Sequence, residues 1–185
     1  MPPKIRITKA QILDAAVELV RQFGAEALNA RELAKQLDCS TQPIFSNFEN
    51  MEQLRNAVVD AAYRMHWQQV EQEIQLGKYP AYKASGMAYI HFAQQERELF
   101  KLLYMRNRTG ETDVEDPETR HLIQGQLQEA MGMGEETAQR FHLEMWAVVH
   151  GFAVMAATGF LPLDEQLISA SITDIYIGLK TRFGI

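Results

Sequence analysis

The spacing of apolar residues most constrains the fold of this chain, because that spacing is helical almost from end to end. Ile12, Ala16 and Leu19 are separated by four and three residues, the period at which side chains share one face of an α-helix. The same spacing predicts helices over about 8–23, 30–37, 41–47, 51–76, 80–95, 96–106, 117–131, 135–158 and 164–183. No stretch alternates apolar and polar residues as a half-buried strand does. We therefore predict an all-α fold with about nine helices.

Capping residues mark several of these helix boundaries. The first helix is expected to begin near Thr8 and to stop at Gly24, because glycine readily adopts the conformations that end a helix. Asn29 and Asn50 stand where the second and fourth helices need a side-chain acceptor for unsatisfied N–H groups. Ser40 is expected to cap the third helix in the same way.

Composition excludes several classes of protein. With 185 residues, 46% apolar and 23% charged, the chain can bury a core. Its longest uncharged stretch, 145–163, contains histidine, proline and two glycines and makes a poor membrane span. The N-terminus lacks the apolar segment of a secretory signal. A single cysteine, Cys39, excludes an internal disulfide and fits a cytoplasmic protein.

The distribution of charge points to the N-terminal end as the place where an anion would bind. The net charge is −6, but residues 1–50 carry six basic and six acidic residues, whereas 51–185 carry twelve and eighteen. Three of the basic residues, Lys4, Arg6 and Lys9, stand at the very front. The net charge thus argues against a general polyanion binder, and an anion is expected to bind at the N-terminal end.

Helices 30–37 and 41–47 are joined by a turn of three or four residues, which is the spacing of a DNA-reading helix-turn-helix. Asp38 tolerates the left-handed conformation that such a turn needs. The residues expected to face inward are Leu33, Ala34, Leu37, Ile44, Phe45 and Phe48, with Phe45 also a partial contact. The outward face carries the hydrogen-bonding side chains of Thr41, Gln42, Ser46 and Asn47, which can reach base edges.

The run LNARELAKQLDCSTQPIFSNFENMEQL resembles the DNA-binding motif of TetR-family transcriptional regulators, and ITKAQILDAAVELVRQFG resembles the family's first helix. The resemblance covers about the first 55 residues. It implies a helix-turn-helix DNA-binding domain over 1–50 and a helical domain for effector binding and dimerisation over 51–185. Helix 51–76 would connect the two.

The chain departs from this family at three positions of the motif. Many members have Gly, Tyr and Lys where this chain has Gln42, Phe45 and Met51. The family's Lys contacts a phosphate and its Tyr hydroxyl often does, so neither contact is available here. Backbone contacts are expected to shift to the basic N-terminus and to the start of the second helix. The expected DNA-binding residues are Lys4, Arg6, Thr8, Lys9, Asn29, Ala30, Ser40, Thr41, Gln42, Pro43, Phe45, Ser46 and Asn47.

A second resemblance lies in the C-terminal half. Trp146, His150 and Gly151 match the Trp-x-x-x-His-Gly signature of one subgroup of TetR-like C-terminal domains, and Gly151 is expected where another helix comes close. An apolar effector pocket is expected between the middle helices. Its candidate residues are Met87, His91, Phe92, Phe100, Leu103, Tyr104, Leu122, Trp146 and His150. Each candidate could instead be ordinary core, and His150 either a polar anchor or a core histidine bonded to a carbonyl.

The two last helices are apolar over a wide arc, which predicts burial on two sides. The family pairs these helices across a two-fold axis, so the resemblance implies a homodimer. The candidate interface residues are Phe152, Met155, Ile168, Ile172, Ile175 and Leu179. Packing within one chain against the middle helices is the alternative.

No set of residues assembles a nucleophile, a base and an orienting group, and the five histidines lack metal-ligand spacing. We expect no enzymatic activity, no metal and no cofactor. The sequence favours a cytoplasmic, homodimeric repressor that binds a palindromic DNA operator and responds to a small, mostly apolar effector. The alternative is an all-α small-molecule carrier or interaction module that has lost DNA binding.

Overall fold

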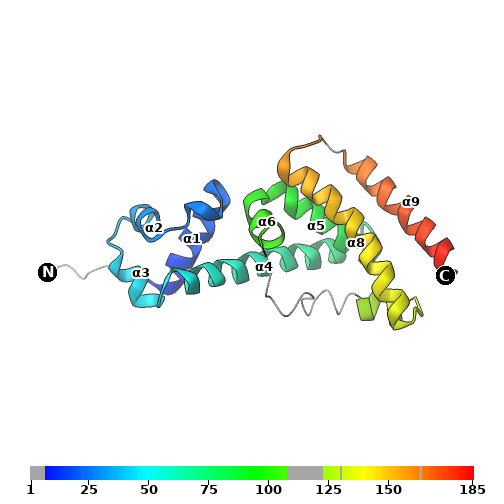
Figure 1. Cartoon of the computed structure of the whole chain (residues 1–185), viewed down its shortest axis with the longest axis horizontal. Coiled ribbons are helices and arrows are strands. Elements are labelled where there is room, and N and C mark those ends of the chain that lie inside the picture. The colour runs from blue at the N-terminus through cyan, green and yellow to red at the C-terminus, as the bar shows by residue number, and fades with distance from the viewer. Residues whose placement is uncertain (1–6, 108–122, 130, 163) are drawn as a thin grey trace. The chain divides into compact units, whose positions relative to one another are not determined.

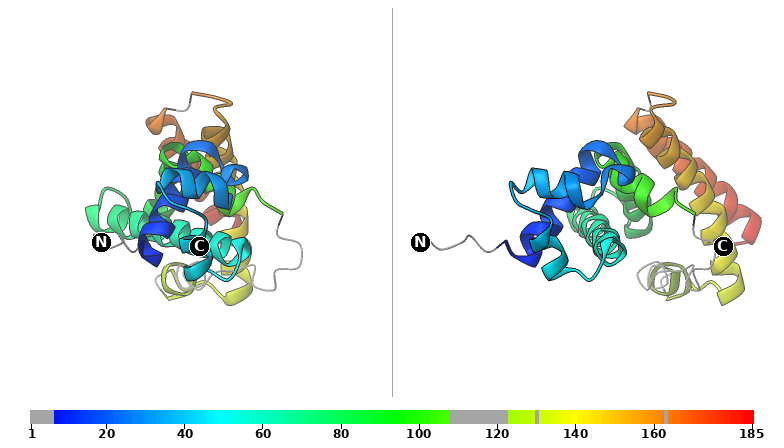
Figure 2. Two further views of the ribbon diagram at one scale, coloured as in Figure 1. Left: turned by 90° about the vertical axis from the view of Figure 1, so that its left-hand side faces the viewer. Right: turned by 60° about the vertical axis from the view of Figure 1, so that its left-hand side comes forward.

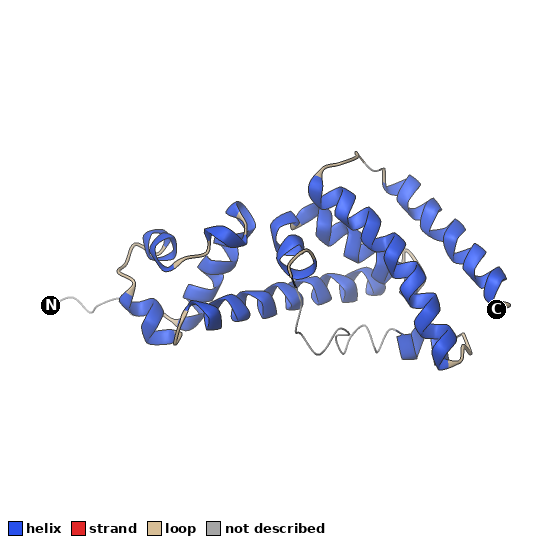
Figure 3. Ribbon diagram, in the orientation of Figure 1, coloured by secondary structure: helices blue, strands red, loops and turns tan. Residues whose placement is uncertain are grey.

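The computed structural model describes residues 7–107, 123–129, 131–162 and 164–185. Within these ranges the chain is helical and contains no strand, which confirms the predicted all-α fold (Figures 1 and 3). The elements are α1 (Lys9–Phe23), η1 (Ala25–Ala27), α2 (Ala30–Gln36), α3 (Gln42–Asn47), α4 (Met51–Leu76), α5 (Ala81–Gln95), α6 (Arg97–Tyr104), the π-helical η2 (Ile123–Glu129), α8 (Glu135–Thr158) and α9 (Glu165–Phe183).

The chain forms two compact units. Unit 1 combines residues 1–67 with 96–106, and unit 2 combines 68–95 with 107–185. Helix α4 therefore contributes its first part to unit 1 and its last turns to unit 2. The functional boundary expected at residue 50 is a separate claim and stays a prediction.

The ends of α1 lie where the sequence predicts them. The hydroxyl oxygen of Thr8 accepts a hydrogen bond from the Gln11 N–H at 3.2 Å, and the Thr8 N–H donates to the Gln11 side chain at 2.9 Å. At the other end Gly24 has a φ of 83° and donates its N–H to the Val20 carbonyl. Both caps depend on residues within four positions, which is why the sequence alone reveals them.

The start of α4 is also confirmed, but the cap of α3 is not the predicted one. The Asn50 side chain accepts from the Gln53 N–H at 2.8 Å, as expected. In α3 the N-cap position is Thr41 rather than Ser40, and the Thr41 side chain makes no capping bond. Pro43 in the first turn has no N–H, so this helix start needs one acceptor fewer.

Unit 1 includes α6, which packs against the C-terminal end of α1. Arg21 donates to Glu96 at 2.8 Å and to Glu18 at 2.7 Å, so its guanidinium joins the two helices. The Glu98 side chain also reaches the end of α1, since a Cβ built on Gly24 would lie 3.0 Å from its carboxylate oxygen. The apolar face of α6 is fully buried, through Leu99, Phe100 and Leu103.

Unit 2 is built on α5, α8 and α9, with α9 lying alongside α8 (Figure 1 and the right-hand view of Figure 2). Helices α5 and α8 meet at Gly86, where an added Cβ would lie 3.3 Å from a methyl of Val149. No helix of the same chain comes close to Gly151 among the described residues, because a Cβ there would meet nothing within 4 Å, and the close approach expected there stays a prediction. The glycine that permits close packing between these helices is therefore on α5.

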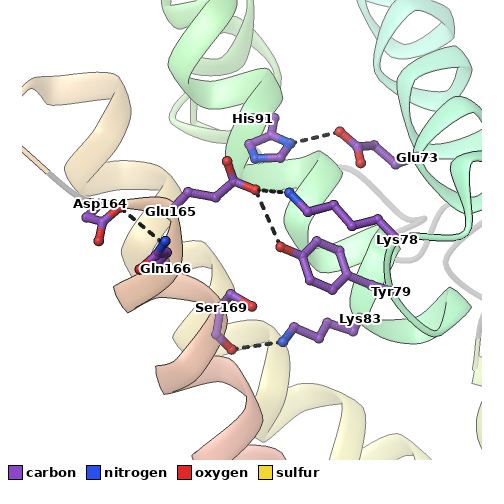
Figure 4. Close-up of polar contacts among 9 residues, drawn as sticks. All are labelled: Glu73, Lys78, Tyr79, Lys83, His91, Asp164, Glu165, Gln166 and Ser169. Carbon is purple, nitrogen blue, oxygen red and sulfur yellow. Dashed lines mark hydrogen bonds and ion pairs between the residues drawn. The ribbon is translucent and has the colours of Figure 1, made fainter.

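Polar contacts fasten the start of α9 to the segment between α4 and α5 (Figure 4). Lys78 donates to the Glu165 carboxylate at 2.6 Å, and the Tyr79 hydroxyl reaches the same oxygen at 3.4 Å. One turn further on, Lys83 donates to the Ser169 carbonyl at 3.0 Å. These bonds fix the register of α9 within unit 2 at its polar end.

Candidate nucleic-acid interface

The α2–turn–α3 segment has the geometry of a helix-turn-helix. Asp38 adopts a φ of 48°, the left-handed conformation predicted for the turn. The Cys39 N–H donates to the Ala34 carbonyl at 2.9 Å and closes the end of α2. Leu33, Ala34 and Ile44 are buried, and both short helices pack against α1. The predicted inward face is confirmed at these three positions.

The outward face of α3 consists of Gln42, Phe45 and Ser46, all of which are exposed. Their spacing of three and four residues places them on one side of the helix. Phe45 corrects the expectation of a core residue, since 48% of its surface is exposed whereas Phe48 is 2% exposed. The reason is that Phe45 lies one residue past the buried Ile44, so its side chain leaves α3 on a different side of the helix.

Two of the side chains expected to contact bases each donate a hydrogen bond to a backbone carbonyl within α3. The Ser46 hydroxyl donates to the Gln42 carbonyl at 2.9 Å. The Asn47 amide donates to the Pro43 carbonyl at 2.8 Å. Ser46 has no second donor, so it can offer a base only an acceptor.

The groups expected to meet phosphates are only partly available. The Asn29 side chain caps α2 by accepting the N–H groups of Arg31 and Glu32, both at 3.1 Å. Thr8 is occupied in the capping box of α1. Lys9 is exposed, and its ammonium lies 4.8 Å from the centre of the Phe48 ring, beside the end of α3. Of the other expected residues, Lys4 and Arg6 lie outside the described residues; Ala30, Thr41 and Pro43 are half-buried and Ser40 is exposed.

Arg55 is a basic residue near this surface that sequence reasoning missed. It is exposed on α4, one turn beyond Met51, and its guanidinium donates to the Leu28 carbonyl at 3.4 Å. That carbonyl precedes Asn29, so Arg55 places a positive charge beside the start of α2. The sequence could have indicated Arg55, because it stands four residues after Met51 and residues four apart share a helix face.

The pocket candidates are divided between the two units. Met87 and Phe92 are fully buried in unit 2, whereas Phe100, Leu103 and Tyr104 belong to unit 1. Leu122 lies outside the described residues. A pocket that gathers all nine candidates stays a prediction.

His150 bonds to a tyrosine rather than to a backbone carbonyl. Its Nδ1 lies 3.0 Å from the Tyr89 hydroxyl, and burial lowers the pKa of the imidazole. The Trp146 ring stacks on it with centroids 4.7 Å apart and planes inclined by 14°. Because Trp146 is 40% exposed, the pair lies at the surface of α8 rather than inside unit 2.

His91 is held by a carboxylate. Its Nδ1 lies 2.9 Å from Glu73, which joins α5 to the end of α4 (Figure 4). Both side chains are largely buried. This contact gives His91 a packing role within unit 2 that the sequence does not reveal.

Unit 1 contains a further histidine that the sequence reasoning did not single out. His66 on α4 is only 3% exposed, and its Nδ1 lies 3.0 Å from the Tyr104 hydroxyl on α6. Burial lowers its pKa to about 4, so the imidazole is neutral at neutral pH. Tyr63 and Phe100 pack edge-on or tilted against the same tyrosine ring. The pair spans 38 residues of sequence, which no local pattern could connect.

Among the described residues, no three His, Cys, Asp or Glu side chains gather closely enough to bind a metal ion. Searching the same residues finds no helix with the length and apolarity that a membrane crossing requires.

Comparison with known proteins accounts for most of the chain. Residues 12–58 match the family model for bacterial regulatory proteins of the tetR family. Residues 82–174 match the model for the tetracyclin repressor-like C-terminal domain. The uncharacterized HTH-type transcriptional regulator YobS of Bacillus subtilis (strain 168) is 20% identical over 171 residues, covering 92% of this chain and 90% of its own length. A solved protein of unknown function from Rhodococcus sp. RHA1 shares the fold, with a TM-score of 0.75 and 21% identity over 96% of this chain and 98% of its own.

Proposed function

This chain belongs to the TetR family of transcriptional regulators, and we propose that it is a homodimeric repressor that binds a palindromic operator and responds to a small, mostly apolar effector. Residues 1–50 would bind DNA, and residues 51–185 would bind the effector and the second copy. The effector would shift the equilibrium by binding one arrangement of the two DNA-binding domains better than another.

The outward face of α3 is the observation that carries this proposal. Gln42, Phe45 and Ser46 are exposed on one side of a short helix that packs against α1 and has Ile44 buried. A glutamine amide can pair with the edge of adenine, and short side chains allow the helix to enter the major groove. A packed core behind the face holds these side chains in one orientation.

Contacts to the phosphates would come from the basic residues around this face. Lys9 lies beside the end of α3, and Arg55 lies beside the start of α2. Arg55 would supply the charge that Met51 lacks at the start of α4. Lys4 and Arg6 would add to them, and the remaining contacts are those named from the sequence. Such contacts position the protein on DNA without reading its sequence.

An exposed apolar surface on α8 and α9 supports the homodimer. Leu143 and Trp146 are exposed on α8, and Leu167 and Ile177 are exposed on α9. At Gly151 and Gly178, a Cβ would meet nothing within 4 Å. A second copy would cover this surface and would bring its own helices close to those glycines.

This surface differs from the interface that the sequence suggested. Ile168 and Ile172 are 1% and 2% exposed within one chain, so they have little surface left for a partner. The other four candidates, Phe152, Met155, Ile175 and Leu179, are half-buried. We therefore place the centre of the dimer contact on Leu143 and Trp146.

The effector site, the cellular location and the absence of catalysis are proposed on the same family grounds. The mostly apolar candidates Met87 and Phe92 favour an apolar effector in the C-terminal domain. The Trp146 and His150 signature is a proposed, finer subgroup assignment. Members of this family are DNA-binding proteins rather than enzymes, so we propose a non-enzymatic protein that acts in the cytoplasm.

The first experiment is selection of bound sequences from a random DNA pool at near-physiological salt. The expected result is a two-fold symmetric motif whose half-sites are about 34–36 Å apart or a multiple of that. Affinity for this motif should fall steeply as salt rises. A folded, dimeric protein that enriches no motif would instead favour the carrier or interaction module, which the missing lysine at Met51 keeps open.

A matched pair of variants separates positioning contacts from reading contacts. Lys9→Ala should weaken binding by a similar factor for every sequence, because it removes a phosphate contact. Gln42→Ala should relax the preference at particular base pairs. If neither variant changes binding to the selected motif, the assignment of these contacts is wrong.

A further inference from the structure

The one aromatic side chain on the outward face of α3, Phe45, is exposed to solvent although it carries no polar group. Phe45 is 48% exposed, while its neighbours Ile44 and Phe48 are buried. A phenyl ring has neither donor nor acceptor, so it cannot bind a phosphate or pair with the polar edge of a base. An exposed ring on a binding face must therefore be covered by something apolar when the face is occupied.

The position of Phe45 limits what can cover it. Gln42 lies three residues before it and Ser46 directly after it, and both are exposed on the same side of α3. A helix that enters the major groove with this side first brings the ring to the base edges. In the major groove, the C5-methyl of thymine is the apolar group that a base presents.

Two neighbouring side chains of α3, Ser46 and Asn47, have limited capacity to bond to bases, so the apolar contact of Phe45 gains importance for sequence recognition. The Ser46 hydroxyl and the Asn47 amide each donate to a carbonyl within α3, at 2.9 and 2.8 Å. They have fewer donors to offer to bases than their residue types suggest. Gln42 and Phe45 are then the two side chains of α3 best placed to distinguish base pairs.

We propose that Phe45 reads the C5-methyl group of a thymine in each half-site of the operator, next to the base pair that Gln42 reads. The inference rests on the proposed DNA-binding function and adds a chemical identity to the site. The shared chemistry is a C5-methylated pyrimidine. A thymine is the source we assign, and 5-methylcytosine carries the same methyl group.

The experiment uses the full-length protein and the operator selected by the wild type. Each thymine of one half-site and its symmetry mate is replaced by deoxyuridine, which removes only the methyl group, and the Kd is measured by fluorescence anisotropy. At one thymine position the wild type should lose about four-fold in affinity per methyl, and about fifteen-fold for the symmetric pair. Other thymines should show smaller losses.

Phe45→Ala should bind the same operator more weakly and should be insensitive to deoxyuridine at that position. Phe45→Tyr keeps the ring and should keep the sensitivity. Phe23→Ala is the matched control, because Phe23 is also an exposed ring of unit 1, 68% exposed, but lies at the far end of α1. It should bind and discriminate like the wild type. Since Phe45 is half-exposed, its truncation opens no core cavity, and thermal unfolding checks that Phe45→Ala remains folded.

The 5-methylcytosine arm separates the methyl group from the rest of the base. A 5-methylcytosine–guanine pair at the sensitive position should bind the wild type about four-fold better than an unmethylated pair, and this gain should vanish in Phe45→Ala.

Three outcomes would overturn the inference: an operator without any methyl-sensitive thymine, equal methyl sensitivity in the wild type and Phe45→Ala, or a loss in Phe45→Ala that is uniform across sequences. The last would make Phe45 a backbone contact. These results leave DNA binding intact, whereas the absence of any selected motif would overturn the proposed function itself.

Discussion

A histidine is bonded to a tyrosine in each unit, and the surroundings of His66 in unit 1 differ from those of His150 in unit 2. His66 lies 3.0 Å from the Tyr104 hydroxyl, and its side chain is enclosed by aromatic rings, with 3% exposure. His150 lies at the same distance from the Tyr89 hydroxyl, but its imidazole stacks on the exposed ring of Trp146; unit 2 holds a further such pair in His142 and Tyr82. The His66 pair is thus enclosed within unit 1, whereas the His150 pair lies beside a ring that one chain leaves exposed.

The exposed side chains of the two units also differ, in polarity. The outward face of α3 is short and mostly polar, with Phe45 as its one large apolar side chain. The exposed side chains of α8 and α9 include four large apolar residues among those described, Leu143, Trp146, Leu167 and Ile177. A polar face of this kind suits base edges and phosphates, and a broad apolar face suits a second copy.

The largest expected effect tests whether unit 2 is incomplete without a partner. Leu143→Lys places a charge on the apolar face of α8 and should convert the dimer into monomers in sedimentation experiments at micromolar concentration. Loss of the second half-site contact should weaken operator binding about 100-fold or more. Leu76→Lys, at an exposed leucine at the end of α4, is the matched control and should leave both properties unchanged. A Leu143→Lys variant that remains dimeric would refute the proposed interface.

The second prediction tests the sealed interior of unit 1. Burial lowers the pKa of His66 from 6.5 to about 4, so the unfolded chain binds more protons than the folded one between these values. Stability is therefore full above pH 6.5 and falls as the pH drops toward 4, by about 2–3 kcal/mol at pH 4.5 from this group.

Urea unfolding of the wild type and of His66→Phe at pH 7.5 and 4.5 measures this contribution. The variant cannot be protonated at this position, so its free energy of unfolding should depend less on pH by about that amount. Other acidic and basic groups titrate in both proteins and cancel in the difference. Parallel pH profiles would mean that His66 is not sealed from water as the structure has it.

The third prediction concerns the polar exterior of unit 1. Arg55→Ala should weaken operator binding about ten-fold for all sequences. In a plot of the logarithm of the binding constant against the logarithm of the salt concentration, the steepness of the slope should fall by about 1 for each copy in a dimer. The reason is that Arg55 places its charge beside the start of α2. Arg64→Ala, at another exposed arginine of α4, serves as the control. If the two variants weakened binding equally, Arg55 would contribute only through the overall positive charge of the protein and not through a phosphate contact.

The smallest expected effect compares an ion pair from each unit. Arg21 is 36% exposed and joins α1 to Glu96 before α6, whereas Lys78 is 58% exposed where it meets Glu165. Arg21→Met should lower the free energy of unfolding by about 1 kcal/mol, since its hydrogen bonds are partly shielded from water. Lys78→Met should cause no measurable change. The reverse order would show that the polar end of α9 matters more than its exposure suggests.

Local contacts explain which parts of the fold the sequence could predict. The bonds at Thr8, Asn29 and Asn50 each span two or three residues, and Gly24 adopts a positive φ where the first helix stops. Such features depend on residue type and short spacing, so they are visible without a structure. Ser40 is the exception. Two residue types that favour the N-cap position, Ser40 and Thr41, are adjacent before α3, and the helix begins after Thr41.

Long-range packing explains what the sequence could not predict about the site. Whether Phe45 is inside or outside depends on how α3 is rotated against α1, and the apolar type of the residue alone suggested the core. Arg55 reaches Leu28 across 27 residues.

The sequence by itself determined the helical period, most helix ends, the turn at Asp38 and the resemblance to TetR regulators, because each is written in residues close together in the chain. Only the tertiary structure decided that Phe45 faces outward, that Ile168 and Ile172 are buried within one chain, and that His66 meets Tyr104. The physical reason is that a helix face has no fixed partner until distant helices pack. Burial and pairing then follow from which surfaces meet.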